Sequence, residues 1–156
     1  MITIKPVAFV RGGRAHVTDD YWGDSRAQIV LADDIPTESL DGLDTFSHAE
    51  IVFFFDKVDE KSIVMGGRHP RGNTAWPRVG IFAQRGKARP NRLGVTIVEI
   101  EKRDGRALHV RGLDAVDGTP VVDIKPVIAE FLPRSPVRQP AWAHELMRDY
   151  WKPGNC

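Results

Sequence analysis

The chain has 156 residues, of which 42% are hydrophobic and 28% charged, with a formal net charge of +1. This composition is typical of one globular domain large enough for a hydrophobic core. It excludes a disordered chain, and since no apolar run approaches about 20 residues it excludes a membrane-spanning helix. Because residues 1–6 lack the order of a signal peptide, we expect a cytoplasmic protein with no membrane contact.

Short apolar segments recur along the chain, with turn residues between them. The segment 49–55 is almost continuously apolar, which is typical of a strand buried on both faces, and Asp104-Gly105 predicts a hairpin turn. Without a long helix between them, these segments predict a mainly β fold, either an antiparallel barrel or a sandwich. We expect strands at residues 2–10, 28–31, 49–55, 79–83, 93–100, 107–110 and 121–124.

The C-terminus predicts one short helix. Pro140 suits the first helical position, and Trp142, Leu146 and Tyr150 recur every four residues, while Pro153-Gly154 predicts the end. We expect this face to pack on the barrel, with a dimerisation helix as the alternative. The chain is therefore divided into a barrel domain, residues 1–131, and a C-terminal extension, residues 132–156.

Charge is unevenly distributed. Residues 19–44 hold eight acidic side chains and one basic, whereas residues 68–92 hold seven basic and none acidic. Such a basic stretch favours either a phosphate-rich partner or surface pairing with the acidic stretch. Residues 57–78 form a long stretch with little periodicity, which indicates a functional or disordered loop. Its guanidinium, imidazole and indole groups suit phosphates and bases.

Two segments, residues 85–94 and 113–126, place charged residues and turn residues next to predicted strands, which is typical of a binding site. Asp117-Gly118 predicts a tight turn, so Asp117 either caps backbone or carries chemistry. Asp123 and Lys125 share a strand face, so they form either a surface ion pair or part of the site.

Several chemistries are excluded by motif. The chain has no glycine-rich phosphate loop and no Gly-x-Ser-x-Gly elbow. Its five histidines lack metal-ligand spacing, and the one cysteine, Cys156, excludes a disulfide within the chain, so we expect no metal.

A resemblance follows from four segments: residues 40–48, 79–85, 89–94 and 117–126, the last reading Asp-Gly-Thr-Pro-Val-Val-Asp-Ile-Lys-Pro. Together they resemble the TsaA-like family in consistent order over residues 1–130. The resemblance implies a β-barrel methyltransferase that uses S-adenosylmethionine, and a homodimer with cofactor clefts near the interface. That family includes the enzyme that methylates threonylcarbamoyl-adenosine beside the tRNA anticodon. This chain lacks the Pro-Arg-Gln triplet of many members and has Asp56 where many have His.

The resemblance also implies roles for individual residues. Asp117 or Asp123 would be catalytic, taking the proton of the substrate's exocyclic amine directly or through water. The cofactor would contact Arg85, Val95, Arg111, Gly112, Leu113, Asp114, Asp56 and Lys57. The substrate, a tRNA, would contact Arg68, His69, Arg71, Arg89, Asn91 and Lys125.

Three hypotheses follow. The first is a methyltransferase acting on the modified tRNA adenosine. The second is a methyltransferase for a small molecule or another RNA. The third is a non-catalytic RNA-binding barrel, which has little use for acidic side chains in a basic site.

Overall fold

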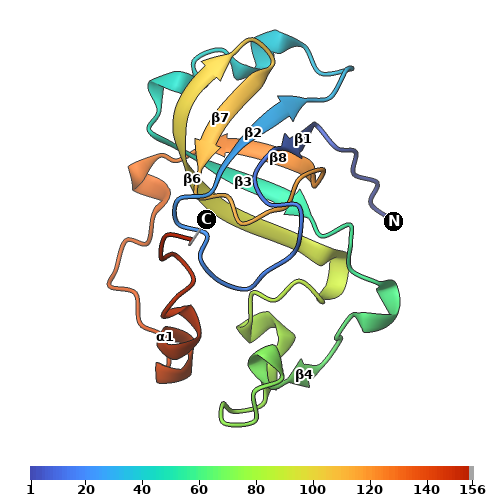
Figure 1. Ribbon diagram of the computed structural model, residues 1–156, viewed down its shortest axis with the longest axis vertical. Helices are drawn as coiled ribbons and strands as arrows, with labels where there is room; N and C mark the ends of the chain where they lie inside the picture. The colour runs from blue at the N-terminus through green and yellow to red at the C-terminus, as the bar shows by residue number, and fades with distance from the viewer. Residues whose placement is uncertain (155–156) are drawn as a thin grey trace.

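The computed structural model describes residues 1–154, and six antiparallel strands in it close into a barrel in the order β1-β2-β7-β6-β3-β8 (Figure 1). The barrel strands are β1 (Ala8–Arg11), β2 (Arg26–Leu31), β3 (His48–Phe54), β6 (Leu93–Asp104), β7 (Ala107–Arg111) and β8 (Pro120–Pro126). A separate two-stranded sheet pairs β4 (Gly67–Arg68) with β5 (Val79–Gly80). One α-helix, α1 (Ala141–Met147), follows the barrel. Short 3₁₀ turns lie at Thr37–Leu40, Leu43–Thr45, Glu60–Ser62, Pro70–Gly72, Ile81–Ala83, Pro90–Arg92 and Ala129–Phe131.

Alternation along the strands fills the barrel interior. In β3 the residues Ala49, Ile51 and Phe53 are buried, while their neighbours in the strand are half-buried. Burying each large side chain of this kind contributes roughly 1.5–3 kcal/mol. The barrel predicted from the apolar segments is therefore confirmed, and the sandwich is excluded.

Strand β6 is the longest and is paired unequally along its two edges. It pairs with β3 from Leu93 to Glu99, but with β7 only from Glu99 onward. Residues 93–98 therefore have a strand partner on one side only among the strands that the structure describes. An unpaired edge of this kind offers main-chain groups to other contacts.

Gly94 in β6 allows the closest approach between this strand and the core. A Cβ atom there would lie 2.7 Å from the ring of Phe53 and 2.8 Å from that of Phe55. These two rings pack edge to face with centroids 5.2 Å apart. The position therefore has no room for a side chain.

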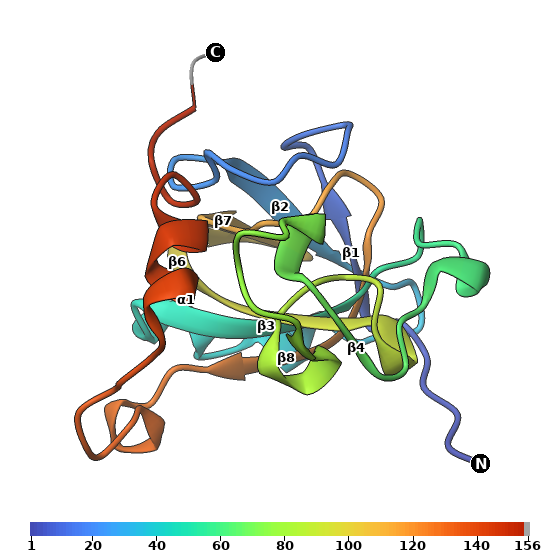
Figure 2. The ribbon, with the colours of Figure 1, turned by 90° about the horizontal axis from the view of Figure 1, so that it is seen from below.

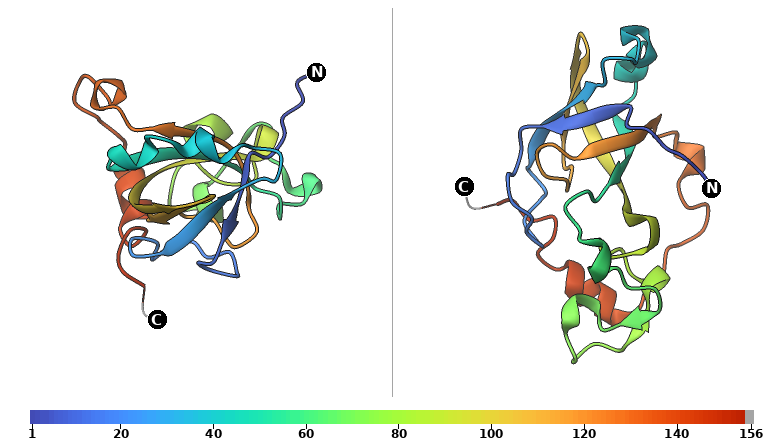
Figure 3. Two further views of the ribbon diagram at one scale, coloured as in Figure 1. Left: turned by 90° about the horizontal axis from the view of Figure 1, so that it is seen from above. Right: turned by 90° about the vertical axis from the view of Figure 1, so that its right-hand side faces the viewer.

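Residues 57–92, hereafter the loop region, project from one end of the barrel (Figures 1 and 2). The helix α1 lies beside this region, as the two views of Figure 3 also show. The stretch 57–78, which has little periodicity, thus contains β4 and two 3₁₀ turns, and its β4 pairs with β5 just after it.

Three predicted elements were wrong in part. The first strand begins only at Ala8, and the strand expected at 79–83 ends at Gly80 because residues 81–83 turn into a 3₁₀ segment. Pro140 has an extended backbone (φ −68°, ψ 156°) and precedes the helix, which ends at Met147 rather than near Pro153.

Beyond Met147 the backbone continues in turns, in which the N–H groups of Tyr150 and Lys152 donate to the carbonyls three residues before them, at 3.1 and 3.3 Å. The carbonyls of Asp149 and Tyr150 accept hydrogen bonds from the N–H groups of Tyr21 and Trp22. No helix within residues 1–154 has both the length and the apolar character needed to cross a membrane.

Candidate active site

The carboxylate of Asp114 lies beside β6 and accepts hydrogen bonds from two side chains. The hydroxyl of Thr96 donates to its Oδ1, and the hydroxyl of Tyr150 donates to its Oδ2. Thr96 faces inward from β6 and is 7% exposed. Each carboxylate oxygen therefore already accepts one hydroxyl, and each keeps a second lone pair.

The chain positions Asp114 by a turn after β7. Gly112 adopts a left-handed backbone (φ +85°), which glycine tolerates, and its N–H donates to the Ser25 carbonyl at 2.8 Å. Leu113 is 1% exposed and anchors the turn in the core. The side chain after it is thus held at the unpaired edge of β6.

Tyr150 reaches this edge from the C-terminus. Burial is the main cause that raises the pKa of its phenol, and the charge and hydrogen bond of Asp114 raise it further. The positive charges of Arg71 and Arg85 oppose that rise. Both guanidiniums therefore lie close enough to the Asp114–Tyr150 pair to act on it electrostatically.

Arg85 completes the edge. Its Nη2 donates to the carbonyl of Val95, on the side of β6 that has no strand partner. An arginine has five N–H donors, and this contact uses one. The exposed guanidinium can therefore hold the β6 edge and also bind an anionic group.

Arg71 links the basic stretch to the acidic stretch. Its guanidinium bonds both oxygens of Asp20, at 3.1 and 3.4 Å, with side chains that are 27% and 25% exposed. Arg71 has a left-handed backbone (φ +55°), which is uncommon for a residue other than glycine. This contact is the surface pairing expected from charge, although it joins one pair and not the whole stretches.

The other basic residues of the loop region mostly bond main-chain carbonyls. Gln84 is 7% exposed, and its amide donates to the carbonyls of Arg68 and Val79 at 3.0 and 3.1 Å. Arg89 donates to the Gln84 carbonyl at 2.6 Å, and Arg68 donates to the Gln84 side chain at 3.4 Å. Arg68 and Arg89, predicted to bind substrate, thus also hold the loop region together.

Residues 141–154, hereafter the C-terminal segment, contact both the loop region and residues 12–25, which connect β1 to β2. The indole of Trp76 donates to Glu145 at 2.7 Å. The N–H of Gly154 donates to Asp24 at 3.0 Å, and Gly23 lies against the backbone of Trp151, where a Cβ atom has no room. The expected face of Trp142, Leu146 and Tyr150 is half-buried, although Tyr150 lies beyond the helix.

Asp117 and Asp123, the two predicted catalytic carboxylates, each have a partner. Asp117 accepts from the N–H of Gly12 at 3.0 Å, and Asp123 pairs with Lys125 at 2.6 Å. Asp123 faces outward opposite Val52, on the far side of β3 from β6. The backbone-capping and ion-pair interpretations of these residues thus describe contacts that are present.

In the part of the chain that the structure describes, three further residues that were predicted to bind the cofactor form no hydrogen bond with Asp114. Arg111 pairs with Glu99 at 2.6 Å on the outside of the barrel. The hydrogen bond and charge of Arg111 lower the pKa of Glu99, and those of Glu99 raise the pKa of Arg111, so the pair favours both charged forms. Asp56 and Lys57 are exposed in the turn after β3. Within residues 1–154, no hydrogen bond or ion pair joins these three side chains to Asp114 or Arg85.

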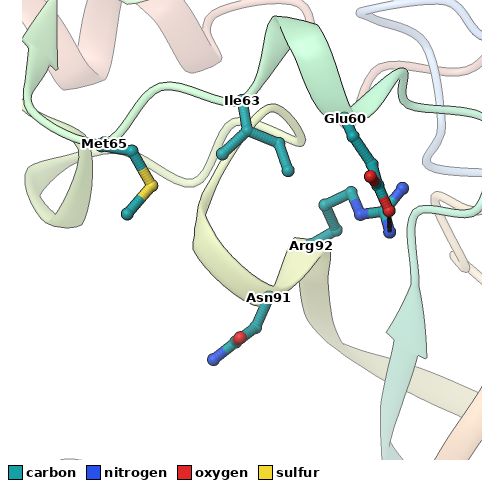
Figure 4. A pocket seen from close by; sticks show the side chains of 5 residues that line it. All are labelled: Glu60, Ile63, Met65, Asn91 and Arg92. Atoms are coloured by element: carbon teal, nitrogen blue, oxygen red, sulfur yellow. Dashed lines mark hydrogen bonds and ion pairs between the residues drawn. The ribbon is translucent and has the colours of Figure 1, made fainter.

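Besides Arg68, Arg71 and Arg89, two further predicted substrate residues lie in the loop region. His69 bonds the Trp76 carbonyl through Nδ1 at 2.8 Å. Asn91 lines an open hollow of about 580 Å³ and has a left-handed backbone (φ +62°). Figure 4 shows this hollow with Arg92 turned toward Glu60, an ion pair of 3.5 Å. Its lining includes none of the predicted cofactor residues, so we place the candidate site at Asp114 instead.

The structure thus brings together Arg85, Val95, Asp114 and Arg71 from the predicted set. It adds Thr96 and Tyr150, which the sequence analysis did not assign to the site. A threonine at an inward-facing position of a strand was the available signal for the first. For Tyr150 the available signal was its polar hydroxyl, but its spacing from Trp142 and Leu146 assigned it to an apolar helix face. The described residues contain no group of three or more His, Cys, Asp or Glu that could hold a metal.

Comparison with known families gives a match to the tRNA-methyltransferase O N-terminal domain over residues 18–131. The chain is 39% identical over 118 residues to a human protein named tRNA (adenine(37)-N6)-methyltransferase, covering 76% of this chain and 26% of the relative. It is 43% identical over 103 residues to the Escherichia coli protein of the same name, covering 62% of this chain and 43% of the relative. A Pyrococcus abyssi protein described as a probable S-adenosyl-L-methionine-binding protein is 35% identical, covering 65% of this chain and 53% of the relative.

Among solved structures, the crystal structure of TrmO from Pseudomonas aeruginosa superposes with a TM-score of 0.73 and 24% sequence identity. The superposition covers 91% of this chain and 62% of that one. At this identity the likeness concerns the fold. The chain spans between about a quarter and a half of the relatives' length, so their names describe longer proteins.

Proposed function

Because the chain belongs to the tRNA-methyltransferase O N-terminal-domain family, we propose that it binds S-adenosylmethionine and methylates an adenosine of tRNA. The observation that carries this proposal is the placement of Asp114, bonded by Thr96, and of Arg85, bonded to the Val95 carbonyl, at the unpaired edge of β6. The acceptor that we propose is the exocyclic amine of threonylcarbamoyl-adenosine beside the anticodon.

The donor groups of the cluster suit this cofactor. S-adenosylmethionine carries an ammonium, a carboxylate and a ribose diol, and when bound it supplies a methyl group activated by its sulfonium. Asp114 keeps acceptor capacity on both oxygens for the diol or the ammonium. Arg85 keeps N–H donors for the carboxylate.

The chain's main contribution would be alignment of donor and acceptor, which can lower a barrier by several kcal/mol and at most by about 10. The acceptor nitrogen must also lose a proton, and a carboxylate within reach directly or through water can take it. Asp117 and Asp123 remain our predicted candidates for that role. Arg68, His69, Arg71, Arg89, Asn91 and Lys125 remain predicted contacts for the tRNA.

We also propose a cytoplasmic homodimer with the cofactor site near its interface. Exposed apolar groups support this arrangement, since Met65 is 74% and Phe82 78% exposed. A hydrogen bond of 2.8 Å from Ile81 N to Gly66 O makes their backbone segments neighbours. Sedimentation velocity should give twice the chain mass for the wild type and a single-chain mass for Phe82→Glu. A wild-type monomer at all concentrations contradicts the dimer.

The acceptor is tested by transfer to tRNA in solution. The purified chain, S-adenosylmethionine and tRNA that contains threonylcarbamoyl-adenosine are incubated, and digested nucleosides are analysed by mass spectrometry. We expect one added methyl group on that nucleoside, absent with tRNA that lacks the threonylcarbamoyl group. Unchanged tRNA together with cofactor binding would contradict the acceptor and favour another substrate.

A further inference from the structure

Tyr150 lies outside the residues that match the family, 18–131, yet its hydroxyl contacts Asp114. We propose that Tyr150 is a positioning residue of the cofactor site, which fixes the Asp114 carboxylate so that the C-terminal segment completes the site. This inference rests on the proposed function, because Asp114 is proposed there to bind S-adenosylmethionine.

The backbone around Tyr150 is held on several sides. Its carbonyl accepts from Trp22 N–H at 2.8 Å, and the preceding carbonyl of Asp149 accepts from Tyr21 N–H at 3.1 Å. Trp22 is itself 2% exposed, so this anchor belongs to the buried part of the protein. The ring of Tyr150 packs edge to face on Trp151 with centroids 4.8 Å apart. The hydroxyl therefore has a defined position.

The hydroxyl and Thr96 act on the two different oxygens of one carboxylate. Two donors on opposite oxygens restrict rotation of the carboxylate, which then presents its remaining lone pairs in one direction. Fixing a binding group before the ligand arrives lowers the entropy lost on binding. The half-buried phenol is protonated at neutral pH, and burial and the neighbouring charge raise its pKa further, so it stays a donor.

The contacts of the C-terminal segment favour this role over general support of the fold. No residue of α1 is buried, so the helix adds little to the core. The segment's polar contacts lead to residues 21–24, to Trp76 and to Asp114, and the last of these lies at the edge of β6. A tyrosine that merely blocked the site would have to leave before a ligand could bind, and that alternative is an outcome of the test.

The experiment is calorimetric titration of the full chain with S-adenosylmethionine for the wild type, Tyr150→Phe and the matched control Tyr21→Phe. These are the two tyrosines of the chain, and Tyr21 is 43% exposed. We expect Tyr150→Phe to bind about tenfold more weakly, the loss of one hydrogen bond to a charged group, and Tyr21→Phe to bind within about twofold of the wild type. Circular dichroism should show that both variants keep the fold without ligand.

A double-mutant cycle separates positioning from support. If Tyr150 acts through Asp114, the variant Tyr150→Phe with Asp114→Asn should bind no more weakly than Asp114→Asn alone. Additive losses overturn the inference, as does equal or tighter binding by Tyr150→Phe when the wild type binds. A wild type that binds no S-adenosylmethionine overturns the proposed function, and this inference with it.

Discussion

The barrel and the loop region are held together by different kinds of interaction. Inside the barrel, strands alternate between core and surface, and side chains such as Ile51 and Phe53 are almost fully buried. In the loop region the central side chain is the amide of Gln84, which bonds the main chain of both β4 and β5. The barrel depends chiefly on apolar burial, whereas the loop region has few buried apolar residues, such as Ile81, and adds polar side-chain contacts to them.

This difference bears on where chemistry can lie. A closed barrel satisfies its own backbone groups and leaves few donors or acceptors for a ligand. The proposed site lies where barrel, loop region and C-terminal segment meet, along residues 93–98 of β6. There the carbonyl of Val95 is bonded by a side chain rather than by a strand. Variants that affect one region alone should therefore distinguish the two kinds of interaction.

The largest effect is expected in the barrel core. Phe53→Ala should lower the free energy of unfolding by about 3–5 kcal/mol, because it leaves a cavity beside Phe55 and Gly94. Phe131→Ala, at a residue 87% exposed, is the control and should stay within about 0.5 kcal/mol. Urea unfolding measures both. Equal losses would show that the core is not the main source of stability.

A smaller, local effect is expected at Gln84. Replacing it with alanine leaves buried carbonyls without their donor, at a cost of about 1–3 kcal/mol. Hydrogen exchange should rise in residues 64–89 and stay unchanged in the barrel strands. Gln28→Ala, at an exposed position of β2, is the control. Faster exchange across the whole barrel would contradict the separation of the two regions.

At Gly23 we expect the C-terminal segment to detach. A Cβ atom there meets the backbone of Trp151, which cannot yield as a flexible side chain could. Gly23→Ala should speed exchange of the N–H groups of Tyr21 and Trp22 more than it lowers global stability. Gly66→Ala, where a Cβ atom meets nothing within 4 Å, is the control. Unchanged protection of those two amides would refute the contact.

The smallest effect depends on pH and concerns Tyr150. Its folded pKa is raised, so the unfolded chain loses this proton first as pH rises through about 10. The contribution is therefore fully present below that pH and is lost above it, with a slope of at most about 1.4 kcal/mol per pH unit. Between pH of about 9 and 11, the wild type should lose more stability than Tyr150→Phe. Parallel curves would argue against a buried phenol.

The barrel could be predicted because its evidence is local. Alternating or continuous apolar runs such as 49–55 predict strands, and Asp104-Gly105 predicts their hairpin. The strand expected at 79–83 and the helix expected to reach Pro153 both end earlier, because the chain continues in 3₁₀-type turns after Gly80 and after Met147. Neither the Ile81–Gly66 hydrogen bond nor the Trp22–Tyr150 hydrogen bond leaves a mark in the neighbouring sequence.

The site could be predicted only in part. Arg85 and Asp114 stood out because charged side chains next to predicted strands are unusual, and the structure brings both to the same edge of β6. The Arg71–Asp20 pair joins residues 51 positions apart, so charge pattern indicated the two stretches and not the contact. The sequence pattern assigned Tyr150 to an apolar helix face. The contact of its hydroxyl with Asp114 could not be predicted, because the pattern does not show that the helix ends before Tyr150.

The most direct test of the proposed site is calorimetric titration with S-adenosylmethionine of the wild type, Arg85→Ala and Lys87→Ala. Lys87 is an exposed cation two residues from Arg85 and matches it in charge. We expect binding by the wild type and Lys87→Ala, and a loss of at least about tenfold for Arg85→Ala, since it removes a charged donor. Equal affinity of Arg85→Ala and the wild type would contradict a cofactor site at this edge of β6.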